Sequence, residues 1–340
     1  MTNCLTILVL GVGGNVSQGI VKALRLSSLR PRIIGACISA EAYGLYACDV
    51  GMLSPLAADA SFIPWVLNVC NEYQVAAILS GVESVLDKLA IHQVEIESTG
   101  AIVVVSGVDA LQVSNDKLRT AQWLESRGCN FARSAPAEDS EAVKRLTDNC
   151  GFPLIAKPRT GKAAIGVRIA RCPSDLTGLP AGYVVQEYLG SEAEEYTAAS
   201  FVDSSREVRG TIVLRRQLIQ GTTCFAEAGN FPNVAEEAAK IARFLPAVGP
   251  CNVQLRMHRG LPVCFEINAR FSGTTAIRAE LGFNDVDAAI RHFVLGEQSI
   301  ELVGARDVVA IRYWNELYVP RSVFDEMRKN GKLTLDNSGK

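Results

Sequence analysis

The chain has 340 residues, more than one small core can use, so two or three domains are expected. Its formal net charge of -2 argues against a general binder of nucleic acid or other polyanions. No apolar run reaches the roughly 18–20 residues that a membrane helix needs, and the first residues show no secretory signal pattern.

The cysteines and histidines exclude two further classes. The ten cysteines are scattered, none in a Cys-x-x-Cys pair, and only three histidines occur. Neither a zinc site nor a disulfide framework is therefore expected. Cysteines of this kind are typical of small buried side chains in a reducing cytoplasm.

Strands that alternate with helices are predicted for the first third of the chain. Residues 5–10 form a continuous apolar run, typical of a strand buried on both faces. A glycine-rich turn at residues 11–15 leads into helical spacing over residues 16–27. Further strands are predicted over residues 32–39, 75–79 and 102–105. This alternation predicts a parallel sheet.

The glycine-rich turn raises the alternative of an NAD-binding oxidoreductase. That fingerprint requires Gly-x-Gly-x-x-Gly and an acidic residue that closes the second strand. Val16 stands at the third glycine position, and the second strand runs into Ser39 rather than an acid. The residues therefore favour a tight strand-to-helix turn without a dinucleotide.

Glu83 follows the third predicted strand at its carboxyl end. Open parallel sheets bind ligands at that edge, which makes Glu83 a candidate substrate residue. An acid in the first turn of a helix, favoured by the helix dipole, explains the same residue equally well.

A second unit begins near residue 113. Asp116 gives a helix-start signal, with Lys117 in the first turn. After a strand over residues 152–157 comes a basic loop over residues 159–166, which contains Gly161, Lys162 and Gly166. Such a loop can close over phosphates because glycine lets backbone amides approach the oxygens. A flexible hairpin is the alternative.

Beyond residue 150 the predicted pattern becomes mostly antiparallel, which marks a change of domain. Strands are predicted over residues 183–188, 197–202, 210–216, 251–255, 265–270 and 308–319, and a helix over residues 233–245. The last strand is rich in aromatic residues, which are expected in the core.

One strand of this second part carries a polar row. Side chains alternate along a strand, so Glu266, Asn268 and Arg270 share one face. Gln254 on the preceding strand can join them. Oxygen donors suit Mg²⁺, which keeps substrate phosphates in its shell, and an arginine suits a phosphate. The row predicts a magnesium and phosphate site, with the wet face of an edge hairpin as the alternative.

In order and spacing these motifs resemble the ATP-grasp superfamily, most closely the synthetase halves of the carbamoyl-phosphate synthetase large chain. The resemblance covers about residues 5–300 and is carried by residues 11–15, 116–117, 155–158, 159–166, 186–189, 195–196, 252–254 and 266–270. It implies an α/β and α+β fold, in which a Rossmann-like pre-ATP-grasp domain precedes a two-lobed ATP-grasp fold with a mainly antiparallel sheet. The implied domains are residues 1–112, a small lobe with the phosphate loop over 113–186, and a large lobe with the magnesium and substrate site over 187–340.

The resemblance also implies a nucleotide site. Lys117 and Lys157 would contact the ATP phosphates from two sides, under the loop that contains Gly161, Lys162 and Gly166. Glu187 and the backbone near Leu189 would hold the adenine, and Glu195 the ribose hydroxyls. Mg²⁺, with Mn²⁺ as an alternative, would bind Gln254, Glu266 and Asn268, and Arg270 would face the reacting phosphoryl group.

Substrate residues follow from the chain beyond the polar row. Ser272 and Thr274 lie in the next loop and are candidates for binding an acyl phosphate, and Arg278 for pairing with a substrate carboxylate. A helix cap with Arg278 in solvent is the alternative. Arg215 and Arg216 point to opposite faces of their strand, and Arg215 is predicted to enter the cleft as a catalytic residue.

The resemblance implies a stand-alone ligase rather than a carbamoyl-phosphate synthetase. Only one copy of the motifs is present, and Ala269 replaces the family's proline. The implied reaction phosphorylates a carboxylate with ATP and then joins the acyl group to an amine. The expected partners are these small molecules, without nucleic acid or membrane, and a homodimer is one option. An NAD-dependent oxidoreductase and a non-catalytic nucleotide-binding module remain the alternatives.

Overall fold

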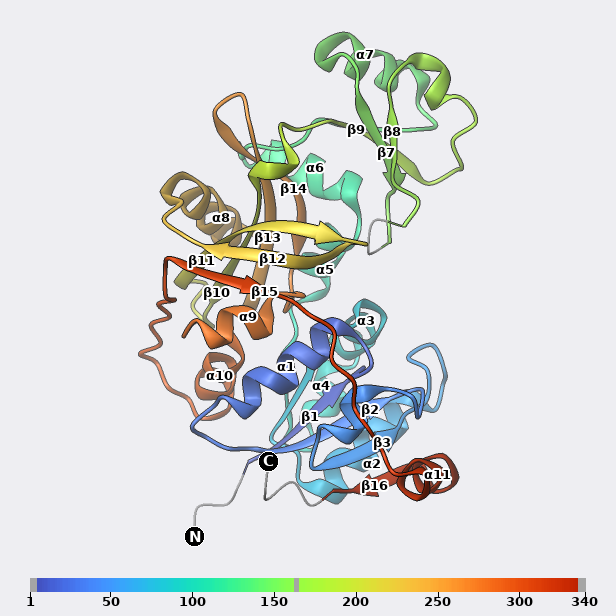
Figure 1. Cartoon of the computed structure of the whole chain (residues 1–340), viewed down its shortest axis with the longest axis vertical. Helices are drawn as coiled ribbons and strands as arrows, with labels where there is room; N and C mark the ends of the chain where they lie inside the picture. Colours follow the sequence, from blue (N-terminus) through green and yellow to red (C-terminus); the bar gives the residue numbers. More distant parts are fainter. Residues whose placement is uncertain (1–4, 162–164, 336–340) are drawn as a thin grey trace.

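The computed structural model describes residues 5–161 and 165–335 of the chain. These residues form three sheets that follow one another along the long axis of the molecule (Figure 1). None of the described helices combines the length and apolarity that crossing a membrane requires.

The first sheet is parallel except for one edge and has the order β16-β3-β2-β1-β4-β5. Its strands are β1 (Thr6–Leu10), β2 (Arg32–Cys37), β3 (Val50–Leu53), β4 (Ala77–Ser80), β5 (Ile102–Val103) and β16 (Lys332–Thr334). Its helices are α1 (Asn15–Arg25), α2 (Phe62–Tyr73), α3 (Glu83–Ile91), α4 (Gln93–Glu97) and α5 (Val108–Asn115). All five residues of β1 are buried between two apolar clusters, which confirms the predicted doubly buried strand.

The glycine-rich turn joins β1 to α1. Gly11 has φ +73°, and the backbone amides of Gly11 and Val12 both donate to the Ala36 carbonyl. A Cβ at Gly11 would lie 2.3 Å from the Val82 side chain, so only glycine fits. This is the tight strand-to-helix turn that the residues favour.

The second sheet is small and antiparallel, in the order β6-β9-β7-β8. It consists of β6 (Ser134–Pro136), β7 (Leu154–Pro158), β8 (Arg168–Ala170) and β9 (Tyr183–Glu187), with α6 (Lys117–Ser126) and α7 (Ser140–Cys150). The Asp116 carboxylate accepts hydrogen bonds from the amides of Leu118 and Arg119, which confirms the predicted start of α6.

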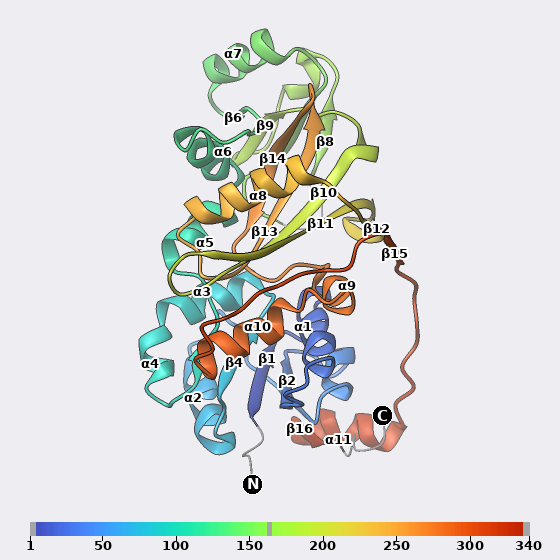
Figure 2. The same ribbon diagram turned by 90° about the vertical axis from the view of Figure 1, so that its left-hand side faces the viewer.

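The third sheet is antiparallel throughout, in the order β14-β13-β10-β11-β12-β15. Its strands are β10 (Glu195–Val202), β11 (Val208–Ile219), β12 (Thr222–Ala228), β13 (Gly249–His258), β14 (Leu261–Asn268) and β15 (Val308–Ile311). The helices of this part are α8 (Pro232–Phe244), α9 (Thr275–Glu280) and α10 (Asp285–Ala289). Helix α8 crosses one face of the sheet, while α9 and α10 lie toward α1 of the first unit (Figure 2).

The last part of the chain differs from the prediction. The strand expected over residues 308–319 ends at Ile311, and the aromatic side chains of Tyr313, Trp314 and Tyr318 are exposed rather than buried. The chain then returns to the first sheet through α11 (Arg321–Asn330) and β16. We keep the division into residues 1–112, 113–186 and 187–340 as a proposal.

Candidate active site

A cavity of about 460 Å³ lies where the three sheets meet. Its walls come from the glycine-rich turn, the start of α3, the start of α6, β7, the end of β9, the β11–β12 hairpin and the β13–β14 hairpin. The carboxyl edge of the first sheet therefore faces the polar row of the third sheet, as expected for a ligand site in an open parallel sheet.

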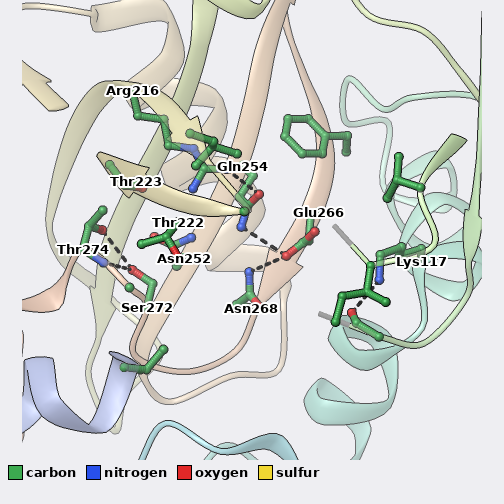
Figure 3. Close-up of a pocket in the computed structure, with 18 of the residues that line it drawn as sticks. Lys117, Arg216, Thr222, Thr223, Asn252, Gln254, Glu266, Asn268, Ser272 and Thr274 are labelled. Carbon is green, nitrogen blue, oxygen red and sulfur yellow. Dashed lines mark hydrogen bonds between the residues drawn. The ribbon is translucent and has the colours of Figure 1, made fainter. Parts of the chain in front are cut away.

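The antiparallel register of β13 and β14 builds the polar wall. Gln254 lies opposite Glu266, and Asn252 lies opposite Asn268. One oxygen of Glu266 accepts hydrogen bonds from the Gln254 and Asn268 amides, both at 3.1 Å (Figure 3). The structure thus brings together the three predicted magnesium ligands.

The donor chemistry of this wall fits a magnesium ion. Glu266 supplies a carboxylate, and Asn268 supplies an amide oxygen that accepts no hydrogen bond among the described residues. The Gln254 oxygen fits less well, since it already accepts from Arg216 at 2.7 Å. No cluster of three acidic, histidine or cysteine side chains occurs in the described part of the chain. A site of this kind would leave room for the phosphates and waters that Mg²⁺ retains.

A buried carboxylate links three strands beside this wall. Glu195 of β10 accepts from Arg216 of β11 at 2.8 Å and from Arg256 of β13 at 2.7 Å. All three side chains line the cavity. Both carboxylate oxygens are engaged, so the ribose contact expected for Glu195 would have to share them with two arginines. That contact stays a prediction.

The prediction for Arg215 is wrong. Arg215 pairs with Glu227 on β12 and lies outside the lining of this cavity. Its neighbour Arg216 has the inward position instead, because the register places Arg215 opposite Tyr196 and therefore Arg216 on the face of Glu195. Arg216 is the cleft arginine of β11.

Two lysines face the polar wall. Lys157 on β7 is buried, and its ammonium donates to Gln186 at 2.7 Å. Burial lowers the pKa of Lys157 to about 8; Glu266 opposes the shift, and Lys117 adds to it. Lys117 donates to the Gly161 carbonyl at 3.0 Å and so contacts the predicted phosphate loop. Among the described residues, the cavity therefore places two lysines opposite Glu266.

The rest of the predicted loop is only partly related to the cavity. Gly161 and Ile165 line the cavity, whereas Gly166 packs against Pro158 and Tyr183 outside the lining. Lys162 lies outside the described residues.

A histidine that the sequence did not single out lies beside the residues predicted to hold the adenine. Glu187 and Leu189 line the cavity at the end of β9. His258 accepts from the Gly190 amide through Nδ1 and lies 3.3 Å from Glu187 through Nε2. The hydrogen bond from Gly190 links the chain after β9 to the end of β13.

The substrate candidates divide into two groups. Ser272 and Thr274 are buried and line the cavity, and so does Glu83, which pairs with Arg270 at 2.7 Å. The prediction for Arg278 is wrong. Arg278 is buried beneath the cavity, where it pairs with Asp285 and donates to the Ser272 hydroxyl at 2.8 Å.

Asn252 is a further cavity residue that was not among the predicted site residues. This buried residue lines the cavity, and its oxygen accepts from Thr197 at 2.9 Å. The bond orients the amide so that Nδ2 is free of partners among the described residues. The signal was present, because Asn252 is two residues from Gln254 and thus on the same face.

The buried pair predicts a clear stability difference. Arg278→Ala should lower the free energy of unfolding by about 3–5 kcal/mol, because it leaves the Asp285 charge buried and unpaired. Arg215→Ala is the matched control and should cost at most about 1 kcal/mol, since its pair with Glu227 is half-exposed. Urea unfolding followed by circular dichroism measures both. Equal losses would contradict the assignment of Arg278 to a supporting role.

Several known proteins are similar to this chain in sequence. A family model described as "ATP-grasp in the biosynthetic pathway with Ter operon" matches residues 181–317. The formate-dependent phosphoribosylglycinamide formyltransferase of Synechococcus sp. (strain CC9605) is 27% identical over 50% of this chain and 41% of its own length. A probable alpha-L-glutamate ligase of Teredinibacter turnerae is 28% identical over 59% of this chain and 69% of its own length. The chain thus matches less than half of the first of these relatives.

Solved structures extend the likeness of fold beyond the matched segment. The N5-carboxyaminoimidazole synthetase of Staphylococcus aureus complexed with ADP has a TM-score of 0.73, with 16% identity, over 91% of this chain and 82% of its own. The biotin carboxylase domain of the Hydrogenobacter thermophilus 2-oxoglutarate carboxylase has a TM-score of 0.66, with 15% identity, over 87% of this chain and 71% of its own. An ATP-grasp family model thus matches residues 181–317, and the likeness to the solved structures shows the same fold over most of the chain.

Proposed function

We propose that this protein is an ATP-dependent ligase that activates a carboxylate as an acyl phosphate and joins it to an amine, releasing ADP and phosphate. One observation carries the proposal: the wall formed by Asn252, Gln254, Glu266 and Asn268 faces Lys117 and Lys157 across a single cavity. The names of two relatives include a carboxylate, formate in one and L-glutamate in the other. Neither substrate is assigned to this chain.

The first step transfers the γ-phosphoryl group to a carboxylate oxygen. Phosphoryl transfer depends on positioning and charge neutralisation more than on a covalent protein group. Lys117 and Lys157 supply positive charge for the phosphates, and Arg270 faces the reacting group. A Mg²⁺ bound at Glu266 and Asn268 would neutralise phosphate charge as a Lewis acid.

The second step is attack of an amine on the acyl carbon, which expels phosphate. Asn252 lines the cavity, and its buried amide Nδ2 has no partner among the described residues, so this amide is a candidate donor to the oxyanion that forms on the acyl group. Ser272 and Thr274, held by Arg278, would bind the acyl phosphate. Glu83 lies beside Arg270, where a carboxylate can attract an ammonium or accept its proton.

Both alternatives are less well supported. The relatives described above give no support to an NAD-dependent oxidoreductase. A non-catalytic nucleotide-binding module would have no need of a carboxylate opposite two phosphate cations. The cytoplasmic location expected from the cysteines stays a prediction.

The polar wall predicts a specific loss of activity. Glu266→Gln keeps the shape of the side chain but removes its charge, so carboxylate-dependent ADP release should fall about 100-fold or more. Glu227→Gln, on β12 outside the cavity lining, should retain most of the activity. Coupled measurement of ADP with pools of carboxylic acids tests both. A fully active Glu266→Gln variant would refute the site.

The pKa of Lys157 predicts proton uptake on nucleotide binding. Without nucleotide, Lys157 has a pKa of about 8. A bound phosphate favours the ammonium form of Lys157, so the pKa of this lysine rises in the complex. At pH 8.5 binding of MgADP should therefore take up more than about half a proton, and affinity should fall as pH rises above 8.

Calorimetry in two buffers of different ionisation enthalpy measures this uptake. Lys157→Arg remains charged over the whole range, so it should lose most of the proton uptake while still binding nucleotide. Identical uptake in the wild-type protein and in Lys157→Arg would show that another group titrates.

A further inference from the structure

The third sheet has one unprotected edge. In the described part of the chain, strand β15 is the outermost strand and pairs only with β12. The Arg312 amide donates to the Cys224 carbonyl, so Arg312 and Ala310 turn their backbone groups toward β12. By the same alternation, Val309 and Ile311 turn theirs toward the open edge.

Apolar side chains extend along this edge. Val309, Ile311 and Tyr313 share one face, with exposed fractions of 50%, 72% and 78%. Trp314 and Tyr318 follow, exposed by 95% and 89%. The segment runs along the outside of the molecule between the third sheet and α11 (Figures 1 and 2). We call residues 308–318 the aromatic edge.

The aromatic edge lacks the usual protection of an edge strand. Native proteins normally place charges or proline there, which blocks pairing with another chain. Between residues 308 and 314 the sole charged side chain is Arg312, and its guanidinium is partly buried and donates to the Gly273 carbonyl. Nothing on the exposed face of β15 itself opposes pairing.

We propose that the aromatic edge is the interface of a homodimer, in which β15 pairs antiparallel with β15 of a second copy. Self-pairing about a twofold axis satisfies both open edges at once and joins the two six-stranded sheets. The net charge of -2 leaves little repulsion between copies.

The exposed surface of the aromatic edge is large enough for a stable dimer interface. Three aromatic side chains that are mostly exposed contribute roughly 450–600 Å². Val309, Ile311 and their neighbours bring the total toward the roughly 800 Å² per partner of a stable interface. The interface also lies near the cavity, because Arg312 holds Gly273 between the two lining residues Ser272 and Thr274.

Sedimentation of the full chain tests the interface. The wild-type protein should sediment at twice its chain mass of 36.6 kDa at micromolar concentrations. The double variant Val309→Lys/Ile311→Lys should sediment as a monomer, because two ammonium groups per copy would meet across the paired edges. Val94→Lys, at an exposed position on α4, is the matched control and should remain dimeric.

Hydrogen exchange of backbone amides distinguishes a dimer that pairs through β15 from a dimer that forms through another surface. The backbone amides of Val309 and Ile311 should exchange slowly in the wild-type dimer and at least tenfold faster in the double variant. Unchanged thermal unfolding would show that the variant is folded. A monomeric wild-type protein overturns the proposal, and so does a dimer that persists in the double variant or leaves these two amides unprotected.

Discussion

The register between β13 and β14 is the constraint on which the cavity depends. It sets Gln254 opposite Glu266 and Asn252 opposite Asn268, so that one carboxylate and three amides form a continuous polar surface. A slip of one residue would turn the whole row to the other face of the sheet. The neighbouring strand β10 pairs with β13 and places Glu195 opposite Arg256, which extends the same surface toward the arginines.

Ion pairs hold the charged side chains around this surface in place. Glu195 lies between two arginines, Arg270 meets Glu83, and Arg278 meets Asp285. An isolated ion in such surroundings would cost several kcal/mol, and each pair avoids that cost by hydrogen bonding. The pairs also join parts that are distant in sequence, since Glu83 belongs to the first unit and Arg270 to the end of the polar row. Lys157 is the exception: it is buried with an amide partner and has a lowered pKa.

The sequence predicted those features that depend only on neighbouring residues in the chain. The buried strand β1, the Asp116 cap and the shared face of Glu266 and Asn268 follow from composition, capping chemistry and period two. The choice between Arg215 and Arg216 did not follow, because alternation says that they point to opposite faces but not which face is the cleft. That answer lies in the pairing of β11 with β10.

Two other predictions differ from the structure because they also depended on tertiary contacts. Arg278 sits on a short helix, and its partner Asp285 follows seven residues later after a turn, so neither a solvent-facing nor a substrate-facing position was correct. The aromatic residues after Ile311 were expected in a core because of their type. Their exposure depends on the path of the chain from the third sheet to α11.

The most direct test of the central claim is to trap the acyl phosphate. The protein would be incubated with MgATP, hydroxylamine and pools of carboxylic acids, and both the nucleotide product and acyl hydroxamate would be measured. The account predicts that one acid gives ADP and its hydroxamate in equal amounts, and that Glu266→Gln gives neither. AMP and pyrophosphate in place of ADP, or hydroxamate that forms equally well with Glu266→Gln, would contradict it.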